Sequence, residues 1–256
     1  MKRFGVTNYG DPSLNYSWVE NLKGMEGAIV ISKGASTKLE DALLENRDKI
    51  IYHATCTGLG GTMIEPNVPT IVEKFDHIKR LIKYGFHANQ IVMRIDPVMP
   101  IGYVDIINKL CGINYIEKLR NILDSSKSLR IERIRYSYLK LTKSIKSNFE
   151  NLHYEFVGKN TNEYVDLKSI NPDFHYEACC ENLADYSERF GCISDIDTHI
   201  LGVSKKIKLE YPEKFKNECR CPLNRVEMIL SNKGFDCSFG CIYCYLKDNE
   251  RKKPIA

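Results

Sequence analysis

Short apolar runs alternate with helical patterns along most of the chain. Each run is too short for a buried helix, so it predicts a strand. The predicted strands are residues 4–7, 28–31, 50–54, 91–95, 134–139, 174–178 and 226–230. Alternation of strands and helices over this length is typical of a parallel α/β sheet or barrel.

The clearest predicted helix lies between the third and fourth strands. Pro69 and Thr70 begin it and Gly85 ends it. Its apolar residues recur at helical spacing, and they are Ile71, Phe75, Ile78, Leu81 and Ile82. Two shorter helices are predicted within residues 103–123, separated at Gly112.

Composition places the chain among folded globular proteins. It has 256 residues, 43% hydrophobic and 27% charged, which excludes wholesale disorder. We expect one domain over residues 1–256, with 173–256 as a cysteine-rich C-terminal part and a loop at 158–172. No apolar run has the length of a membrane span, and no signal-peptide pattern follows Met1. We therefore expect a cytoplasmic protein with no membrane partner.

The net charge of +4 is mildly basic, which is compatible with an anionic substrate or a nucleic acid but does not require one. Residues 127–146 are rich in Lys and Arg, with tyrosines between them. This segment has two interpretations: a nucleic-acid track with stacking aromatics, or a strand at 134–141 with a solvated flank. The alternation of residue types favours the strand.

Ten cysteines are unusual in a chain with no export signal. Cys56 and Cys111 are isolated, but the other eight fall in the last third: Cys179, Cys180, Cys192, Cys219, Cys221, Cys237, Cys241 and Cys244. Cytosolic thiols stay reduced, so a disulfide scaffold is not expected. The clustering favours ligation of a metal or an iron–sulfur cluster.

Cys237, Cys241 and Cys244 have the spacing C-x3-C-x2-C. Three thiolates can hold three irons of a cubane cluster and leave the fourth iron open to another molecule. Structural zinc sites normally use four protein ligands, often as C-x2-C pairs. Gly234 and Gly240 allow the tight backbone that a loop around a cluster needs. The triplet therefore favours an iron–sulfur cluster over zinc.

This triplet, with Tyr243 just before its last cysteine, resembles the signature of the radical S-adenosylmethionine (SAM) superfamily. The resemblance implies a [4Fe-4S] cluster whose open iron binds SAM, and a reductant such as a flavodoxin or ferredoxin. It also implies reductive cleavage of SAM to a 5'-deoxyadenosyl radical, which abstracts hydrogen from a substrate. Members of the superfamily fold as full or partial (β/α) barrels.

Most members carry the triplet near the N-terminus, after the first barrel strand, whereas here it lies near the C-terminus. The chain looks more like a bacterial and viral family with such a cluster at its C-terminus. Spore photoproduct lyase is a more distant relative in chemistry. The segments that carry the family resemblance are Thr57-Gly58, Glu65-Pro66-Asn67-Val68-Pro69, Arg94-Ile95-Asp96-Pro97, Cys179-Cys180-Glu181, Cys192-Ile193, Cys219-Arg220-Cys221 and Cys241-Ile242-Tyr243-Cys244-Tyr245.

We therefore expect an α/β fold, a partial (β/α) barrel that is circularly permuted relative to the usual radical SAM enzymes. Strand 226–230 would then lie beside strand 4–7. The resemblance implies that the residues after strand 4–7 hold the SAM amino group, and these are Asn8, Tyr9, Gly10 and Asp11. Asp11 suits an ammonium, but an ordinary Asp-Pro turn is the alternative.

The remaining clustered cysteines predict a second site. Cys219 and Cys221, with Cys179 and Cys192, would supply four ligands for a second [4Fe-4S] cluster or a zinc ion. Cys180 could substitute for Cys179. The alternative is that some of these are buried apolar cysteines.

Parallel barrels place their chemistry at the carboxyl ends of strands. Arg94 could bind a carboxylate or phosphate there, and Asp96 a ribose hydroxyl or an amine; the alternative is a structural Arg94–Asp96 pair before Pro97. Cys56 could return a hydrogen atom to a substrate radical, although a lone core cysteine is favoured.

The sequence thus predicts a radical SAM enzyme that acts on an unidentified substrate, with a nucleic acid or nucleotide as the first hypothesis. The alternative is a non-catalytic nucleic-acid-binding protein stabilised by zinc or an iron–sulfur cluster. A third hypothesis is an iron–sulfur electron carrier.

Overall fold

The structure is a computed structural model that describes residues 3–152, 163–179, 189–211, 221–229 and 237–244. The described residues form eight strands: β1 (Phe4–Val6), β2 (Gly27–Ser32), β3 (Ile50–Thr55), β4 (Ile91–Val98), β5 (Arg133–Tyr138), β6 (His175–Cys179), β7 (Arg189–Phe190) and β8 (Arg225–Glu227). The α-helices are α1 (Ser17–Leu22), α2 (Thr37–Glu45), α3 (Ile71–Lys83), α4 (Ile101–Cys111), α5 (Tyr115–Ser128), α6 (Lys143–Glu150), α7 (Leu167–Ile170) and α8 (Asp195–Ile200). Two 3-10 turns, η1 (Arg47–Lys49) and η2 (Ala88–Gln90), precede β3 and β4.

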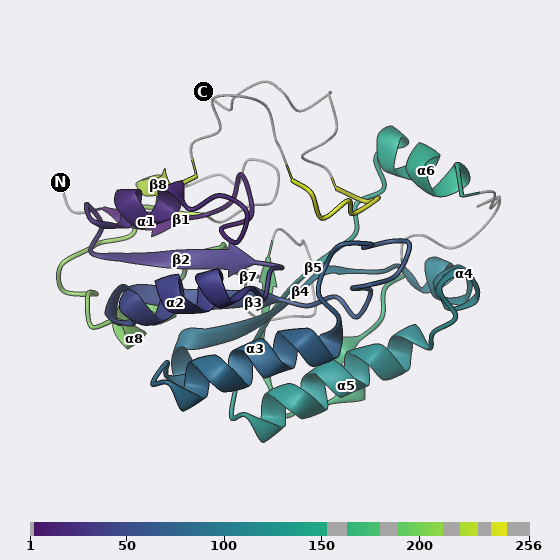
Figure 1. Cartoon of the computed structure of the whole chain (residues 1–256), viewed down its shortest axis with the longest axis horizontal. Coiled ribbons are helices and arrows are strands. Elements are labelled where there is room, and N and C mark those ends of the chain that lie inside the picture. Colours follow the sequence, from purple (N-terminus) through teal and green to yellow (C-terminus); the bar gives the residue numbers. More distant parts are fainter. Residues whose placement is uncertain (1–2, 153–162, 180–188, 212–220, 230–236, 245–256) are drawn as a thin grey trace.

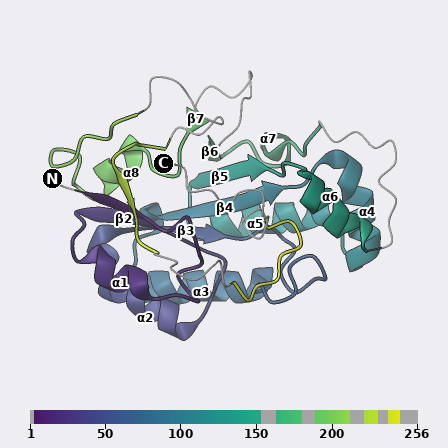
Figure 2. The same cartoon turned by 90° about the horizontal axis from the view of Figure 1, so that it is seen from above.

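All strands lie parallel in one sheet of order β7-β6-β5-β4-β3-β2-β1-β8 (Figures 1 and 2). Each strand pairs with its neighbours in sequence, except that the last one, β8, pairs with the first. Phe4 is in register with Arg225, and Val6 with Glu227. The prediction that the C-terminal strand lies beside the N-terminal strand is confirmed. Within the described residues β7 and β8 do not pair, so the sheet is open.

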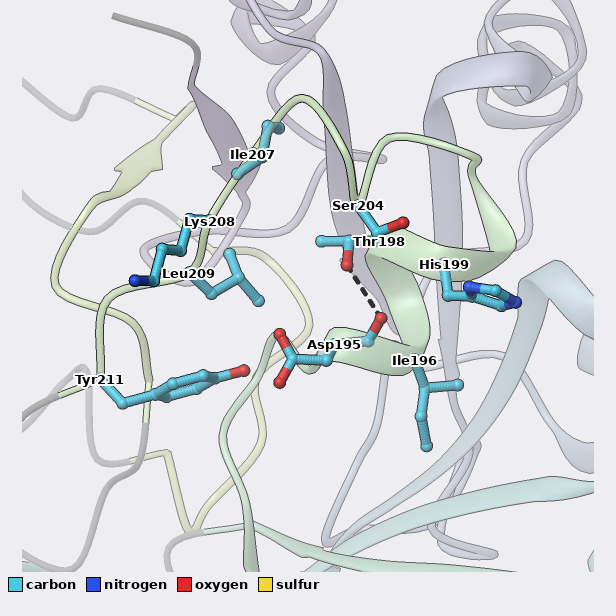
Figure 3. Close-up of a pocket in the computed structure, with 9 residues that line it drawn as sticks. All are labelled: Asp195, Ile196, Thr198, His199, Ser204, Ile207, Lys208, Leu209 and Tyr211. Atoms are coloured by element: carbon cyan, nitrogen blue, oxygen red, sulfur yellow. Dashed lines mark hydrogen bonds between the residues drawn. The ribbon is translucent and has the colours of Figure 1, made fainter.

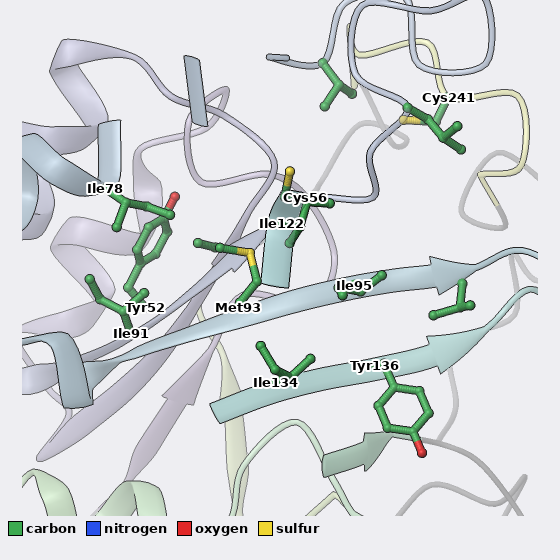
Figure 4. Packing of buried hydrophobic residues seen from close by; sticks show 14 of the residues in the cluster. Tyr52, Cys56, Ile78, Ile91, Met93, Ile95, Ile122, Ile134, Tyr136 and Cys241 are labelled. Carbon is green, nitrogen blue, oxygen red and sulfur yellow. The ribbon is translucent and has the colours of Figure 1, made fainter. Parts of the chain in front are cut away.

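The larger hydrophobic core lies between the sheet and the helices α1 to α5, which cover one face (Figure 1). Side chains alternate along each strand, as the β-strand period requires. In β4, Met93 and Ile95 point into this core, as Figure 4 shows, whereas Val92 belongs to a smaller cluster on the opposite, concave face. The concave face carries the cysteines of β6 and the turn that follows β7.

The predicted helices form close to the expected bounds. Thr70 and Glu73 close a capping box at the start of α3, which satisfies backbone N–H groups there. Gly112 adopts a left-handed conformation, with φ of 62°, and separates α4 from α5. The predicted loop at 158–172 is only partly correct, because its described portion contains the short helix α7.

The basic segment 127–146 contains β5, and the strand interpretation is confirmed. Arg133 and Arg135 are buried in ion pairs on the concave face. Tyr136 and Tyr138 are buried in the main core. A track of stacking tyrosines is therefore wrong for this strand, because its rings have no exposed face.

In the part of the chain that the structure describes, no helix combines the length and apolar character that a membrane crossing requires.

Candidate functional site

The triplet loop, residues 237–244, follows β8 and docks on the segment that follows β3. The Asn67 amide N–H donates to the Phe239 carbonyl at 3.3 Å, and the Asn67 side chain donates to the Ser238 carbonyl at 2.7 Å. The Ile242 N–H donates to the Ile64 carbonyl at 3.1 Å. These bonds fix the backbone of the loop at the carboxyl edge of the sheet (yellow in Figure 1).

Two further contacts hold this loop: Gly240 packs closely against Pro66, and helix α6 donates a hydrogen bond to the loop. Gly240 has φ of +72°, a left-handed conformation that favours glycine, and a Cβ there would lie 3.1 Å from Pro66. Asn148 in α6 donates its side-chain N–H to the Ile242 carbonyl at 2.8 Å. The expectation that a glycine gives the loop its tight backbone is met at Gly240, whereas Gly234 lies outside the described residues.

The three thiols of the triplet share this one docked loop. Cys241 is buried, and Cys237 and Cys244 are half-buried. Burial raises the pKa of the Cys241 thiol to about 12, although the ammonium of Lys33 opposes that rise. Among the described residues, no three or more His, Cys, Asp or Glu side chains surround a position for a single metal ion. A cubane cluster differs, because it takes one thiolate per iron and so spreads its ligands; three thiols on one loop fit that donor set.

Lys33, Glu65 and Tyr243 form a buried polar network beside the triplet. The Lys33 ammonium donates to the Tyr243 hydroxyl oxygen at 2.6 Å and also contacts the Glu65 carboxylate. The Tyr243 hydroxyl donates to one carboxylate oxygen of Glu65. The Thr57 hydroxyl donates to the other carboxylate oxygen of Glu65 at 2.6 Å. Burial lowers the pKa of Lys33, but the charges of Glu65 and Cys241 outweigh it and the net shift is upward. This network ties the triplet loop to β2 and β3.

Sequence reasoning missed Lys33 and Glu65 as site residues. Lys33 comes directly after β2, so the rule that chemistry lies at the carboxyl ends of parallel strands could have found it. Glu65 lies within one of the segments that carried the family resemblance. Tyr243, predicted from the resemblance, is buried and uses its hydroxyl in this network.

The residues predicted to hold SAM follow β1 at the carboxyl edge of the sheet. The Asn8 N–H donates to the Glu227 carboxylate at 2.8 Å. The carboxylate of Asp11 accepts hydrogen bonds from Ser13, at 2.9 and 2.6 Å, from the Ser32 hydroxyl at 2.7 Å and from the Lys33 N–H at 2.7 Å. Asp11 therefore joins the segment after β1 to the end of β2 as well as to its own turn. Of the two residues between Asn8 and Asp11, Tyr9 is exposed and Gly10 is half-buried.

Glu227, the last residue of β8, is a half-buried carboxyl at the same edge. Its oxygens accept from the N–H groups of Asn8 and Ile229, at 2.8 and 3.1 Å. Burial nevertheless raises the pKa of Glu227 to about 7. Its only local signal is its place in a predicted strand, residues 226–230.

We predict that stability falls as pH rises from the ordinary range of a glutamate to about 7, because the folded state binds the Glu227 proton more tightly than the unfolded state. Above that pH the contribution is constant. Urea unfolding at about pH 5 and about pH 8 measures the difference. Glu227→Gln should remove this fall, and the exposed control Glu210→Gln should keep it. Equal pH dependence in both variants would contradict the assignment.

Arg94 and Asp96 lie side by side at the carboxyl end of β4. Arg94 Nε donates to Asp96 Oδ2 at 2.8 Å, and Nη2 lies 2.6 Å from the same oxygen. Burial raises the pKa of Asp96, but Arg94 and a hydrogen bond from Ser137 outweigh it and lower the value. The pair is the one that the structural alternative describes. Nη1 of Arg94 has no partner among the described residues.

Cys56 lies in the main apolar core, near Ile122 and Met93 in Figure 4. Burial raises the pKa of its thiol to about 11. This position matches the favoured interpretation, a lone core cysteine.

The predicted second cysteine group converges on the concave face. Cys179 Sγ lies 3.9 Å from Cys192 Sγ, and the Cys192 N–H donates to Cys221 Sγ at 3.1 Å. Hydrogen bonds from Cys179 and Cys221, helped by nearby arginines, lower the pKa of Cys192 against the effect of burial. The fourth predicted ligand, Cys219, lies outside the described residues, as does Cys180, the possible substitute for Cys179.

A groove of about 860 Å³ runs along α8 and the segment after it (Figure 3). Its lining residues are Asp195, Ile196, Thr198, His199, Ser204, Ile207, Lys208, Leu209 and Tyr211. Leu201, just past α8, lies against Gly27 at the start of β2. The groove is thus at the amino edge of the sheet, opposite the triplet, and contains none of the predicted site residues.

Fold and site together define an α/β protein with an open parallel sheet, whose carboxyl edge gathers a cysteine loop and buried charged groups. The chain belongs to the family described as a domain of unknown function, DUF1848, whose family model matches residues 20–246. Neither the curated proteins nor the solved structures yield a match to this chain.

Proposed function

We propose that this protein is a radical SAM enzyme that cleaves SAM reductively and abstracts hydrogen from a substrate. The observation that carries the proposal is the place of the C-x3-C-x2-C loop. It follows β8, and β8 pairs with β1 at the edge of the parallel sheet. In the radical SAM superfamily, which the triplet resembles, the cysteines follow the first barrel strand. If β8 is counted as the first strand, the order across the sheet is β8, β1, β2 and so on to β7. The cysteine loop then follows the first strand, as it does in that superfamily.

It follows that we also propose a circularly permuted partial (β/α) barrel. The permutation moves one strand and its cysteine loop from the start of the chain to its end and leaves their neighbours unchanged. The parallel pairing of Phe4 with Arg225 and of Val6 with Glu227 supports this relation. The proposal explains why a cluster loop near the C-terminus can face residues that follow β1, β2 and β3.

Each part of the site has a role in this proposal. Cys237, Cys241 and Cys244 would hold a [4Fe-4S] cluster, which, once reduced by a flavodoxin or ferredoxin, supplies the electron that cleaves bound SAM. Lys33 and Glu65 hold Tyr243 and so orient the loop that carries the cysteines.

The residues at the ends of β1 and β4 would bind the small molecules. Backbone groups of Asn8, Tyr9 and Gly10, with Asp11, are proposed to contact SAM, because this segment adjoins β8. Arg94 and Asp96 are proposed to contact the substrate through the unpartnered Nη1 and the partly exposed carboxylate. A nucleic acid or nucleotide remains the proposed substrate class, on the net charge of +4. Such thiol chemistry suits a reducing compartment, the cytoplasm.

The test is metal analysis and spectroscopy on protein prepared anaerobically. We expect about four irons and as many sulfides per chain that are lost when the three triplet cysteines become alanine. We also expect SAM to change the electron paramagnetic resonance spectrum of the reduced protein, because it binds an open iron. Zinc without iron, or a spectrum that SAM leaves unchanged, would overturn the proposal and favour the metal-stabilised binding protein.

A further inference from the structure

A second group of thiols lies on the concave face, away from the triplet and independent of it. Cys179 ends β6, Cys192 follows β7, and Cys221 precedes β8. Cys192 is 13 residues from Cys179 and 29 from Cys221, yet the three meet in the smaller apolar cluster. All three are buried. Three separate segments of the chain therefore deliver one thiol each to one place.

Two of the three sulfurs have the spacing of ligands of one metal atom. Tetrahedral zinc with Zn–S bonds of about 2.3 Å places two thiolate sulfurs about 3.8 Å apart. Cys179 Sγ and Cys192 Sγ are 3.9 Å apart. A disulfide would need about 2.0 Å, and a cubane cluster separates its thiolates further than one ion does. The Cys221 sulfur lies 3.1 Å from the Cys192 nitrogen. The described thiols do not surround one position, so the Cys221 side chain has to rotate toward the other two sulfurs before all three can bind one metal.

Two buried cations face this group. Arg94 Nη2 lies 3.9 Å from Cys179 Sγ, and Nη1 of the same guanidinium has no partner among the described residues. Arg135 Nη1 donates to the Cys192 carbonyl at 2.7 Å and so fixes the turn that carries this cysteine. A neutral thiol is a weak acceptor, whereas a metal-bound thiolate accepts a charge-assisted hydrogen bond well. The surroundings are thus suited to an anionic thiolate centre.

A metal centre would also stabilise the chain between Cys192 and Cys221. Beyond α8, its described residues 203–211 and 221–224 contain no helix or strand. Val203, Ile207 and Leu209 pack into the smaller apolar cluster on the concave face. An irregular segment gains stability when metal ligands fix its two ends. Cys192 stands at the start of this segment, Cys221 at its end, and Cys179 on the sheet beneath.

We propose that Cys179, Cys192 and Cys221 are ligands of a second, thiolate-bound metal centre that fastens the described segments around Cys192 and Cys221 to the concave face of the sheet. The bound species is a thiophilic metal, either a zinc ion or the iron of an iron–sulfur centre. The sulfur spacing favours zinc.

The test uses the full chain with the triplet removed by Cys237→Ala, Cys241→Ala and Cys244→Ala, so that any metal left belongs to the second site. After anaerobic purification we expect about one zinc per chain, or iron with sulfide if the centre is an iron–sulfur one. Adding Cys192→Ala should abolish this metal, whereas adding Cys111→Ala, a half-buried cysteine outside both groups, should leave it. A metal-free triplet variant, or metal that survives Cys192→Ala, overturns the proposal.

A cobalt titration covers the case in which Cys192→Ala does not fold. The triplet variant, stripped with a chelator, is titrated with Co²⁺ alone. Thiolate-to-cobalt absorption that saturates at about one equivalent supports the centre; the spectrum of aqueous Co²⁺ throughout overturns it. Since the triplet is absent from this chain, the result is separate from the test of SAM chemistry.

Discussion

Cys241→Ala is expected to reduce 5'-deoxyadenosine formation to the background of the reaction without enzyme. The substitution removes one of the three thiols of the triplet, so one iron of the proposed cluster would lose its protein ligand. Cys241 is also the most enclosed of the three, with its loop bonded to the segment after β3 on either side of it. Chromatography of the reduced reaction with SAM measures the product, and iron analysis reports the cluster.

The matched control is Cys111→Ala at the end of α4, which should keep both iron and product. Because Cys241 is buried, a loss of folding must be separated from a loss of chemistry. Cys244→Ala removes a half-buried thiol of the same triplet and should give the same loss of product with an unchanged thermal midpoint. Formation of 5'-deoxyadenosine at the wild-type rate by either triplet variant would contradict the proposed mechanism.

Much of the sheet could be predicted from apolar runs because parallel strands buried on both faces are continuous in hydrophobicity. β2, β3 and β4 are of this kind. The place of β8 beside β1 was predicted as a consequence of the permuted barrel, since its own pattern carries no information on its partner. β7 was missed because it is two residues long, Arg189 and Phe190, and has no periodicity to detect.

The candidate site also has one part that could be predicted from the sequence and one part that could not. The triplet is a local motif, so spacing along the chain is enough to find it. The network that holds it is not local: Lys33 lies 210 residues from Tyr243, and Glu65 lies 178 residues from it. Nothing in the neighbourhood of Lys33 or Glu65 encodes that partner. Only the parallel arrangement of β2 and β3, which brings their carboxyl ends to one edge, makes the contact.

The arginines of β5 show how composition can mislead. Residues 127–146 are basic in sequence, which suggested binding of an anion. In the fold, Arg133 Nε donates to Glu177 at 2.6 Å and Arg133 Nη2 to Asp197 at 2.7 Å. Arg135 also contacts Glu177. The charges of these two arginines are neutralised inside the sheet by carboxylates from β6 and α8, so they do not contribute to a basic surface.

This internal network yields the largest expected effect on stability. Glu177→Ala should lower the free energy of unfolding by about 3–5 kcal/mol, because it leaves a buried arginine charge without its partner. Glu177 is fully buried and serves both Arg133 and Arg135, so Asp197 alone would have to compensate two guanidinium groups. Urea unfolding measures the change.

Two further variants show whether charge is the cause. Glu177→Gln keeps the volume of the side chain and removes only its charge, so it should retain most of the loss if electrostatics dominates. Lys127→Ala breaks an ion pair with Asp173 in which both side chains are 58% exposed, and it should leave the unfolding midpoint unchanged. A loss below about 1 kcal/mol for Glu177→Ala would mean that water or the neighbouring carboxylate replaces Glu177, and that the network does not hold β5, β6 and α8 together.

The same network fixes the Cys192 turn through Arg135, so a large loss would also couple the stability of the concave face to its cysteines.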